Sequence, residues 1–169
     1  TKHDGIRYSR NVEDCHGHKV NELYCYVDAS FGDDPLTRRS TIGYLIFLNG
    51  GPIAWKTKLA PTLVQSSTHA ELAALAQATE EVVQLRTLLA ALGAPQEGPT
   101  PMYEDNESCI AIVNHKRSAQ NKHVDVRYEF VREHIRVRDI MMVPCSTLDQ
   151  KADMMTKPLG RVKLATTRE

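Results

Sequence analysis

Apolar and polar residues alternate in the first third of the chain. Leu23, Cys25 and Val27 would point to one side of an extended segment, and Tyr24, Tyr26 and Asp28 to the other. This period of two predicts a strand over residues 23–28. Residues 43–48 predict a second strand, and the turn signal at 49–52 precedes a third that begins at Ile53. We therefore expect a three-stranded meander over residues 23–58.

A long helix is expected next. Ser66, Ser67 and Thr68 are candidate caps, and Gly93 and Pro95 mark the end of the helix. Steps of three and four residues trace one helical face, which is occupied by Glu71, Leu75, Ala78, Val82, Leu85, Leu89 and Leu92.

Shorter elements follow this helix. We expect a strand at 100–104, a helix at 106–115, a helix whose apolar stripe runs from Val124 to Ile135, a strand at 140–143 and a short helix within 148–156. A meander followed by α/β crossovers predicts an α/β fold, with a five-stranded mixed sheet flanked by helices. Residues 22–160 are expected to form one domain, between an N-terminal arm or linker (1–21) and a C-terminal tail (161–169).

The bulk composition sets few limits. The chain has 169 residues and a formal net charge of zero, which suits one compact domain. Nucleic-acid binders usually carry a basic excess, so this balance argues mildly against one, although a cluster of catalytic acids would offset basic residues elsewhere. No apolar run reaches the roughly 18–20 residues that a membrane-spanning helix needs.

Four acids break the local pattern of their elements. Asp28 ends an apolar strand, and Glu71 occupies the inward stripe of the long helix. Asp105 follows the fourth strand, and Asp153 lies between Ala152 and Met154 in the last helix. Buried carboxylates are costly unless they are paired or bound to a metal.

Two divalent cations about 4 Å apart, held by such carboxylates, can activate water and stabilise a leaving oxyanion in phosphodiester hydrolysis. Mg²⁺ prefers hard oxygen ligands of this kind. A single acid of this kind is more often a cap, a turn residue or a salt-bridge partner, which is how we interpret Asp33, Asp34, Asp125 and Asp149.

Longer motifs favour the nuclease interpretation. Residues 26–30, 39–44, 51–56 and 66–71 resemble, in this order, the opening of a copia-type ribonuclease H domain. Residues 103–106 (Tyr-Glu-Asp-Asn) and 122–128 (Lys-His-Val-Asp-Val-Arg-Tyr) are similar to that family's third acidic motif and to its next helix. Residues 149–159, which include Ala-Asp-Met-Met-Thr-Lys-Pro-Leu, resemble its C-terminal block. Residues 5–9 also resemble the junction that follows the reverse transcriptase.

The resemblance implies a ribonuclease H-like fold and an endonuclease that cuts the RNA strand of RNA–DNA hybrids during reverse transcription of an LTR retrotransposon. Its metal ligands would be Asp28, Glu71, Asp105 and Asp153, which would hold two Mg²⁺ ions or Mn²⁺ in their place. Its partners would be the hybrid and the reverse transcriptase domain of the same Pol polyprotein. Its location would be a virus-like particle in the cytoplasm, with the nucleus as an alternative.

The chain departs from the family at several positions, including His69 in place of a common Glu and Glu129 in place of a frequent His. Glu104 stands where a small residue or Cys is usual, and an extra anion beside Asp105 could perturb metal affinity. The loop 144–147 lacks the His that many cellular ribonucleases H carry before their last helix. His123 is the nearest substitute by motif, although exposure or helix capping is the expected role of this residue.

Candidate substrate contacts lie beside the acids. We expect Ala29, Ser30, Asn106 and Ser108 near the RNA 2′-hydroxyl, and Arg39, Ser40 and Thr41 at a phosphate. Lys122, together with the basic run 115–117, could bind the DNA backbone. The alternatives are helix capping for Asn106 and Ser108 and a solvated surface for the basic residues. Trp55 is expected in the core, with base stacking as the alternative.

Two other functions remain open. A catalytically weak or inactive ribonuclease H-like module, such as a connection or domesticated domain, would bind nucleic acid without cutting it. The full set of four acids argues against this module. An integrase-like enzyme would share the sheet, but it commonly uses three acids and different motifs.

Overall fold

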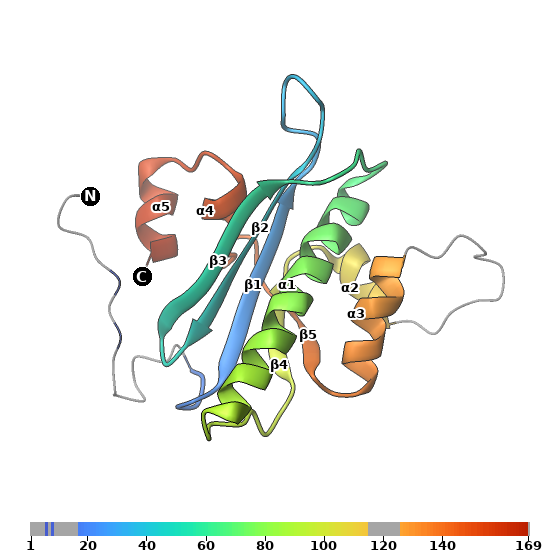
Figure 1. The fold of residues 1–169 in the computed structure, drawn as a ribbon. Coiled ribbons are helices and arrows are strands. Elements are labelled where there is room, and N and C mark those ends of the chain that lie inside the picture. Colours follow the sequence, from blue (N-terminus) through green and yellow to red (C-terminus); the bar gives the residue numbers. More distant parts are fainter. Residues whose placement is uncertain (1–5, 7, 9–16, 115–125, 169) are drawn as a thin grey trace.

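The computed structural model describes residues 6, 8, 17–114 and 126–168, which form one mixed sheet with helices on both faces (Figure 1). The strands are β1 (Leu23–Ser30), β2 (Thr41–Leu48), β3 (Gly51–Leu59), β4 (Thr100–Glu104) and β5 (Ile140–Pro144). Their order is β3-β2-β1-β4-β5. The first three strands are antiparallel neighbours, and β4 is parallel to both β1 and β5. This confirms the mixed five-stranded sheet expected from the sequence.

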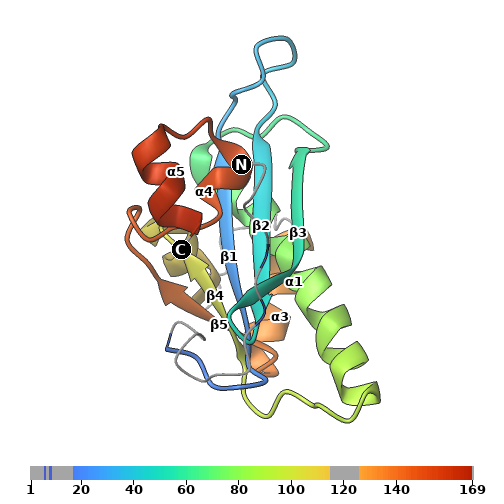
Figure 2. The same cartoon turned by 90° about the vertical axis from the view of Figure 1, so that its left-hand side faces the viewer.

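The helices form two unequal layers (Figure 2). One face of the sheet carries α1 (Ser67–Ala91), α2 (Glu107–Asn114) and α3 (Val126–Arg136), and the other carries α4 (Asp153–Thr156) and α5 (Arg161–Arg168). Residues 161–168, expected as a tail, are therefore helical, and the last short helix is confined to four residues. Within the described part of the chain, no helix combines the length and the apolar character that crossing a membrane requires.

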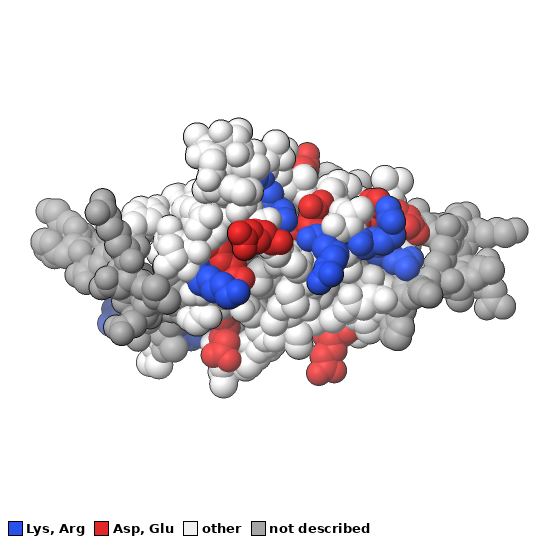
Figure 3. Space-filling model, turned by 90° about the horizontal axis from the view of Figure 1, so that it is seen from below, with Lys and Arg blue, Asp and Glu red and all other residues white. Residues whose placement is uncertain are grey.

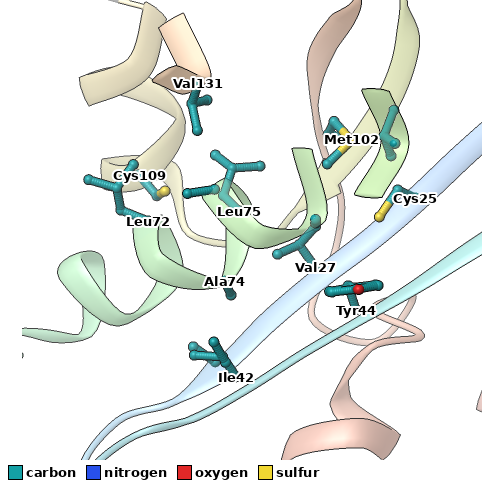
Figure 4. Close-up of a cluster of buried hydrophobic side chains, with 14 of the residues drawn as sticks. Cys25, Val27, Ile42, Tyr44, Leu72, Ala74, Leu75, Met102, Cys109 and Val131 are labelled. Atoms are coloured by element: carbon teal, nitrogen blue, oxygen red, sulfur yellow. The ribbon is translucent and has the colours of Figure 1, made fainter. Parts of the chain in front are cut away.

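The main core lies between the sheet and α1. Leu23, Cys25 and Val27 of β1 all point into it, as their alternation predicts. Figure 4 shows Leu75 of α1 between Val131 of α3 and Val27 of β1. The stripe predicted on α1 is buried as far as Val82, but Leu92 is 71% exposed because it lies beyond the last helical residue.

The other face of the sheet holds an aromatic cluster. Tyr24 stacks on Phe47 with ring centroids 5.0 Å apart, and Tyr26 stacks on Tyr103 at 4.7 Å. Trp55 pairs with Leu45 of this face across β2 and β3. Trp55 is nevertheless 53% exposed, so the expectation of a core position is wrong. Trp55 belongs to β3, an edge strand of the sheet, which has a neighbouring strand on one side only.

Close packing at Gly43 sets the position of α4. Gly43 pairs with Asp28 across β1 and β2. A Cβ built on Gly43 would lie 2.7 Å from Cβ of Met155 and 2.8 Å from Cγ2 of Thr156. Helix α4 can therefore approach the sheet this closely only because residue 43 has no side chain.

Replacing Gly43 by Ala is expected to lower the free energy of unfolding by about 1–3 kcal/mol, because the added methyl group overpacks this contact. Urea unfolding followed by circular dichroism measures the change. Gly98→Ala is the matched control, since no described heavy atom lies within 4 Å of a Cβ built there. Equal stability of the two variants would contradict the role given to Gly43.

Ion pairs cluster at the end of the sheet where β1 begins and α1 ends. Arg86 Nε lies 3.8 Å from Asp139 Oδ1, and His134 Nδ1 lies 2.8 Å from Asp139 Oδ2. Seen from this end, Lys and Arg side chains alternate with Asp and Glu (Figure 3). Opposite charges are mixed here, in contrast to the accumulation of acids at the opposite end.

Candidate metal centre

Asp28 in β1 and Asp105 directly after β4 are placed by two neighbouring parallel strands. Tyr26 of β1 is in register with Tyr103 of β4. Two residues further along the chain, β1 reaches Asp28, and Asp105 directly follows the end of β4, so both acids lie at the same carboxyl edge of the sheet. Asp28 is fully buried, whereas Asp105 is half-buried.

Glu71 reaches this edge from the first turns of α1. The helix begins after Ser66, whose hydroxyl accepts a 3.3 Å hydrogen bond from the His69 backbone N–H, as a capping residue should. Glu71 is 5% exposed. One carboxylate oxygen from each of Glu71, Asp28 and Asp105 lies within 4.8 Å of the others. The structure therefore brings together three of the four acids expected from the sequence.

Asp153, the fourth expected acid, has different neighbours. It is the buried first residue of α4. Among the described residues, the 4.8 Å group does not include Asp153. Lys157 Nζ lies 2.6 Å from Asp153 Oδ1 and 2.9 Å from Asp28 Oδ1, and Lys163 Nζ contacts Asp153 Oδ2. Asp153 is thus connected to the group through an ammonium shared with Asp28.

Glu104 is a fifth acid at the centre. It is fully buried, and its Oε1 accepts a 3.0 Å hydrogen bond from the Asn106 backbone N–H. From the sequence, Glu104 was expected to be an extra anion beside Asp105 and not a member of the site. Strand alternation could have placed it, since Glu104 and the core residue Met102 share one face of β4.

Burial and mutual repulsion shift the acids toward their protonated forms. Burial is the main cause that raises the pKa of Glu71 far above its usual range, and the charges of Glu104, Asp28 and Asp105 raise this pKa further. Burial also raises the pKa of Glu104, with added repulsion from Asp105 and Asp28. Such crowded carboxylates titrate as a set rather than singly.

Lys157 and Lys163 favour the ionised forms of the carboxylates that they contact and so lower the pKa values of these acids. Burial raises the pKa of Asp28, although hydrogen bonds from Thr156 and Lys157 offset part of this effect. For Asp153, burial is again the largest single influence, but the hydrogen bonds from Lys157 and Lys163 outweigh it and lower the pKa. Asp153 therefore has its countercharges within the chain, whereas Glu71 has none of comparable strength.

The donor set fits a hard divalent cation. Glu71 Oε2 and Glu104 Oε2 are buried and have no hydrogen-bond partner among the described residues. Leaving such oxygens unpaired is unfavourable. Three converging carboxylates are the type of ligand that Mg²⁺ and Mn²⁺ bind.

The residues expected at the RNA strand lie beside this centre. Ala29 and Ser30 end β1, and Ala29 is buried while Ser30 is half-buried. Asn106 Oδ1 accepts a 2.9 Å hydrogen bond from the Cys109 backbone N–H, which confirms the capping alternative for Asn106. Ser108 is exposed on the first turn of α2.

The residues expected at a phosphate occupy the loop between β1 and β2. Ser40 is fully buried, and its hydroxyl accepts a 3.0 Å hydrogen bond from the Gly32 N–H, so it supports the loop rather than facing a phosphate. Thr41 donates from its N–H and its hydroxyl to Asp33, at 2.8 and 2.9 Å. Arg39 is half-buried and donates to the Pro61 carbonyl at 3.4 Å. Lys122, His123 and the run 115–117 lie outside the described residues.

Sequence relatives cover most of this chain. A retrovirus-related Pol polyprotein from transposon TNT 1-94 of Nicotiana tabacum is 33% identical over 168 residues, which are 97% of this chain and 13% of the polyprotein. The corresponding polyprotein from transposon RE2 of Arabidopsis thaliana is 36% identical over 144 residues, or 83% of this chain and 10% of the polyprotein. The chain is homologous to copia-type retrotransposon Pol polyproteins. It spans roughly a tenth of the length of these relatives.

Several solved structures resemble this chain in fold. The LC11 ribonuclease H1 from compost superposes with a TM-score of 0.60 at 15% identity, over 81% of this chain and 94% of that one. The N-terminal ribonuclease H domain of a Mycobacterium tuberculosis protein gives a TM-score of 0.59 at 12% identity, over 80% and 95% of the two chains. The chain therefore has the ribonuclease H fold. No family model matches the chain.

Proposed function

We propose that this Pol segment is a divalent-metal-dependent ribonuclease H, which cuts the RNA strand of RNA–DNA hybrids during reverse transcription. The observation that carries the proposal is the convergence of Asp28, Glu71 and Asp105 within 4.8 Å, at the carboxyl edge of this fold. A ribonuclease H1 of the same fold has been solved in complex with an RNA/DNA hybrid, with a TM-score of 0.56 to this chain.

Different residues of the chain would hold the metal and contact the substrate. Asp28, Glu71 and Asp105 would hold the cation, with Asp153 as a further ligand from α4. When bound, Mg²⁺ or Mn²⁺ supplies an activated water and charge stabilisation for the leaving oxyanion. The pairing of β1 with β4 fixes two of the carboxylates, and α1 fixes the third. Ser30 and Ser108, at the rim, would contact the RNA strand.

A cleavage assay on labelled RNA–DNA hybrid tests this proposal. We expect wild-type cutting in Mg²⁺ or Mn²⁺, no cutting in EDTA, and a loss of about 10²–10³-fold in Asp105→Asn, the size typical when one electrostatic group of an active site is removed. Asp149→Asn, the same change at an exposed acid, is expected to cut like the wild type. Wild-type inactivity with both metals, or full activity of Asp105→Asn, would refute the proposal.

A catalytically weak nucleic-acid-binding module is the second candidate. Lys157 and Lys163 favour it, because their ammonium groups already occupy oxygens of Asp28 and Asp153. Hybrid binding without cleavage in either metal would support this alternative.

The biological setting that we propose follows from the Pol relatives. The reverse transcriptase domain of the same polyprotein would supply much of the hybrid affinity, since this chain has a net charge of zero. The site of action would be a virus-like particle in the cytoplasm, or the nucleus.

A further inference from the structure

The buried carboxylates at this edge of the sheet differ in their hydrogen-bond partners. On one side, Glu71 Oε2 is buried without a hydrogen-bond partner among the described residues. On the other, all four oxygens of Asp28 and Asp153 accept hydrogen bonds from donors of the chain itself. These donors are Thr156 and Lys157 for Asp28, and Lys157 and Lys163 for Asp153.

Lys157 is the donor that the two carboxylates share. Its ammonium lies 2.9 Å from Asp28 Oδ1 and 2.6 Å from Asp153 Oδ1, and both acid side chains are 1% exposed. The Lys157 side chain is 37% exposed, so its stem reaches in from the surface. The ammonium therefore lies between two buried carboxylates, one from β1 and one from α4, which would otherwise be free to hold a cation.

We propose that Lys157 is a tethered counterion that occupies the second of the two metal positions and competes with a divalent cation for it. The inference rests on the proposed function, because it concerns the same carboxylates. A Lys ammonium is a compact point charge, and it would strongly repel a second cation placed between Asp28 and Asp153. The position among Asp28, Glu71 and Asp105 stays open, and the bridging position opens only when the ammonium leaves.

This competition predicts stepwise loading. In the absence of nucleic acid, the wild-type domain would bind one divalent ion tightly, at Asp28, Glu71 and Asp105. The second ion would bind only at much higher concentration. Removing the ammonium while keeping a side chain of similar length should make both positions available together.

Calorimetric titration of the metal-free domain with Mn²⁺ tests this. We expect one tight ion for the wild type and two for Lys157→Met, with the second at least about tenfold tighter than in the wild type. Lys157→Arg keeps the positive charge and should bind one ion. Lys56→Met removes a charge from an exposed position on β3 and should also bind one.

The possible results are distinguishable. Equal stoichiometry and affinity in the wild type and in Lys157→Met would overturn the inference alone. Mn²⁺ binding by none of these proteins would overturn both the inference and the proposed function. A second ion that binds Lys157→Met more weakly than the wild type would make Lys157 an aid to metal binding and would also overturn the inference.

A measurement on the wild type covers the case in which Lys157→Met does not fold. Amine acylation followed by mass spectrometry should modify Lys157 more slowly than Lys56 in metal-free protein, because the Lys157 ammonium is held by two carboxylates. A large excess of Mn²⁺ should raise the reactivity of Lys157 toward that of Lys56. Equal reactivity of the two lysines without metal, or no change with Mn²⁺, would refute the competition.

Discussion

Replacing Glu71 by Gln is expected to lower hybrid cleavage by about 10²–10³-fold and, in the same protein, to raise the stability of the metal-free domain. Glu71 is a buried carboxylate whose Oε2 has no hydrogen-bond partner among the described residues, and Glu104 repels it. An amide of the same shape removes that repulsion and can donate to a neighbouring carboxylate. The expected gain is about 1–3 kcal/mol in the free energy of unfolding.

The two effects of Glu71→Gln have opposite signs, which separates a functional carboxylate from a structural one. If Glu71 only supported the fold, its replacement by Gln would lower both the stability and the activity of the domain. Urea unfolding in EDTA and single-turnover hybrid cleavage measure the two quantities. Glu80→Gln, the same change at an exposed position of α1, should leave both unchanged. A less stable Glu71→Gln domain, or one that cuts at the wild-type rate, would contradict this account.

Local pattern was sufficient to predict most of the sheet and three members of the acid group. The alternation from Leu23 to Asp28 sets which residues of β1 face α1, because a strand has two faces and only one of them meets that helix. Asp28 and Glu71 were identifiable because each breaks an apolar pattern at a buried position. Asp105 was identifiable because it directly follows a buried strand.

The sequence-based expectations were wrong where tertiary contacts determine the burial or the hydrogen-bond partner of a residue. Trp55 was expected in the core because a Trp within a strand is usually buried, but β3 is an edge strand, and strand periodicity does not reveal the order of strands. Ser40 was expected at a phosphate, but its hydroxyl accepts a hydrogen bond from the Gly32 N–H. This contact depends on how the loop between β1 and β2 folds back.

The connection of Asp153 to Asp28 through Lys157 was also not predicted from the sequence. The pair Asp153 and Lys157 has the four-residue spacing of an ordinary helical ion pair. The third member, Asp28, is 129 positions from Lys157 along the chain. Asp28 can contact Lys157 only because Gly43, which has no side chain, allows α4 to pack closely against β1 and β2.

The metal-free domain is expected to lose stability as the pH rises above the mildly acidic range. Burial and mutual repulsion raise the pKa values of Glu71 and Glu104 above the ordinary value of 4.5. Above pH 4.5 the unfolded chain has released these protons while the folded domain still holds them. The folded state then binds more protons, so the free energy of unfolding falls, by about 1.4 kcal/mol per pH unit for each proton held. The fall ends where the folded acids ionise.

Thermal unfolding in EDTA across this pH range measures the effect. His18 and Asp153 have lowered pKa values and weaken the fold on the acid side, so the wild type should be compared with Glu71→Gln/Glu104→Gln, in which these contributions remain. The double variant should lose less stability between about pH 5 and 8 than the wild type. Parallel profiles would mean that the two acids do not hold protons in the folded state.

Divalent metal should remove this loss of stability. A cation binds the ionised carboxylates, so its binding must release the protons that Glu71 and Glu104 hold in the metal-free domain. Stabilisation by Mg²⁺ should therefore increase with pH, since fewer protons must be displaced. Calorimetric titration in buffers of different ionisation enthalpy should detect proton release at pH 7 in the wild type and much less in Glu71→Gln/Glu104→Gln. Metal binding by the wild type without proton release would show that these carboxylates are already ionised, and the stability would then have to depend on pH through other groups.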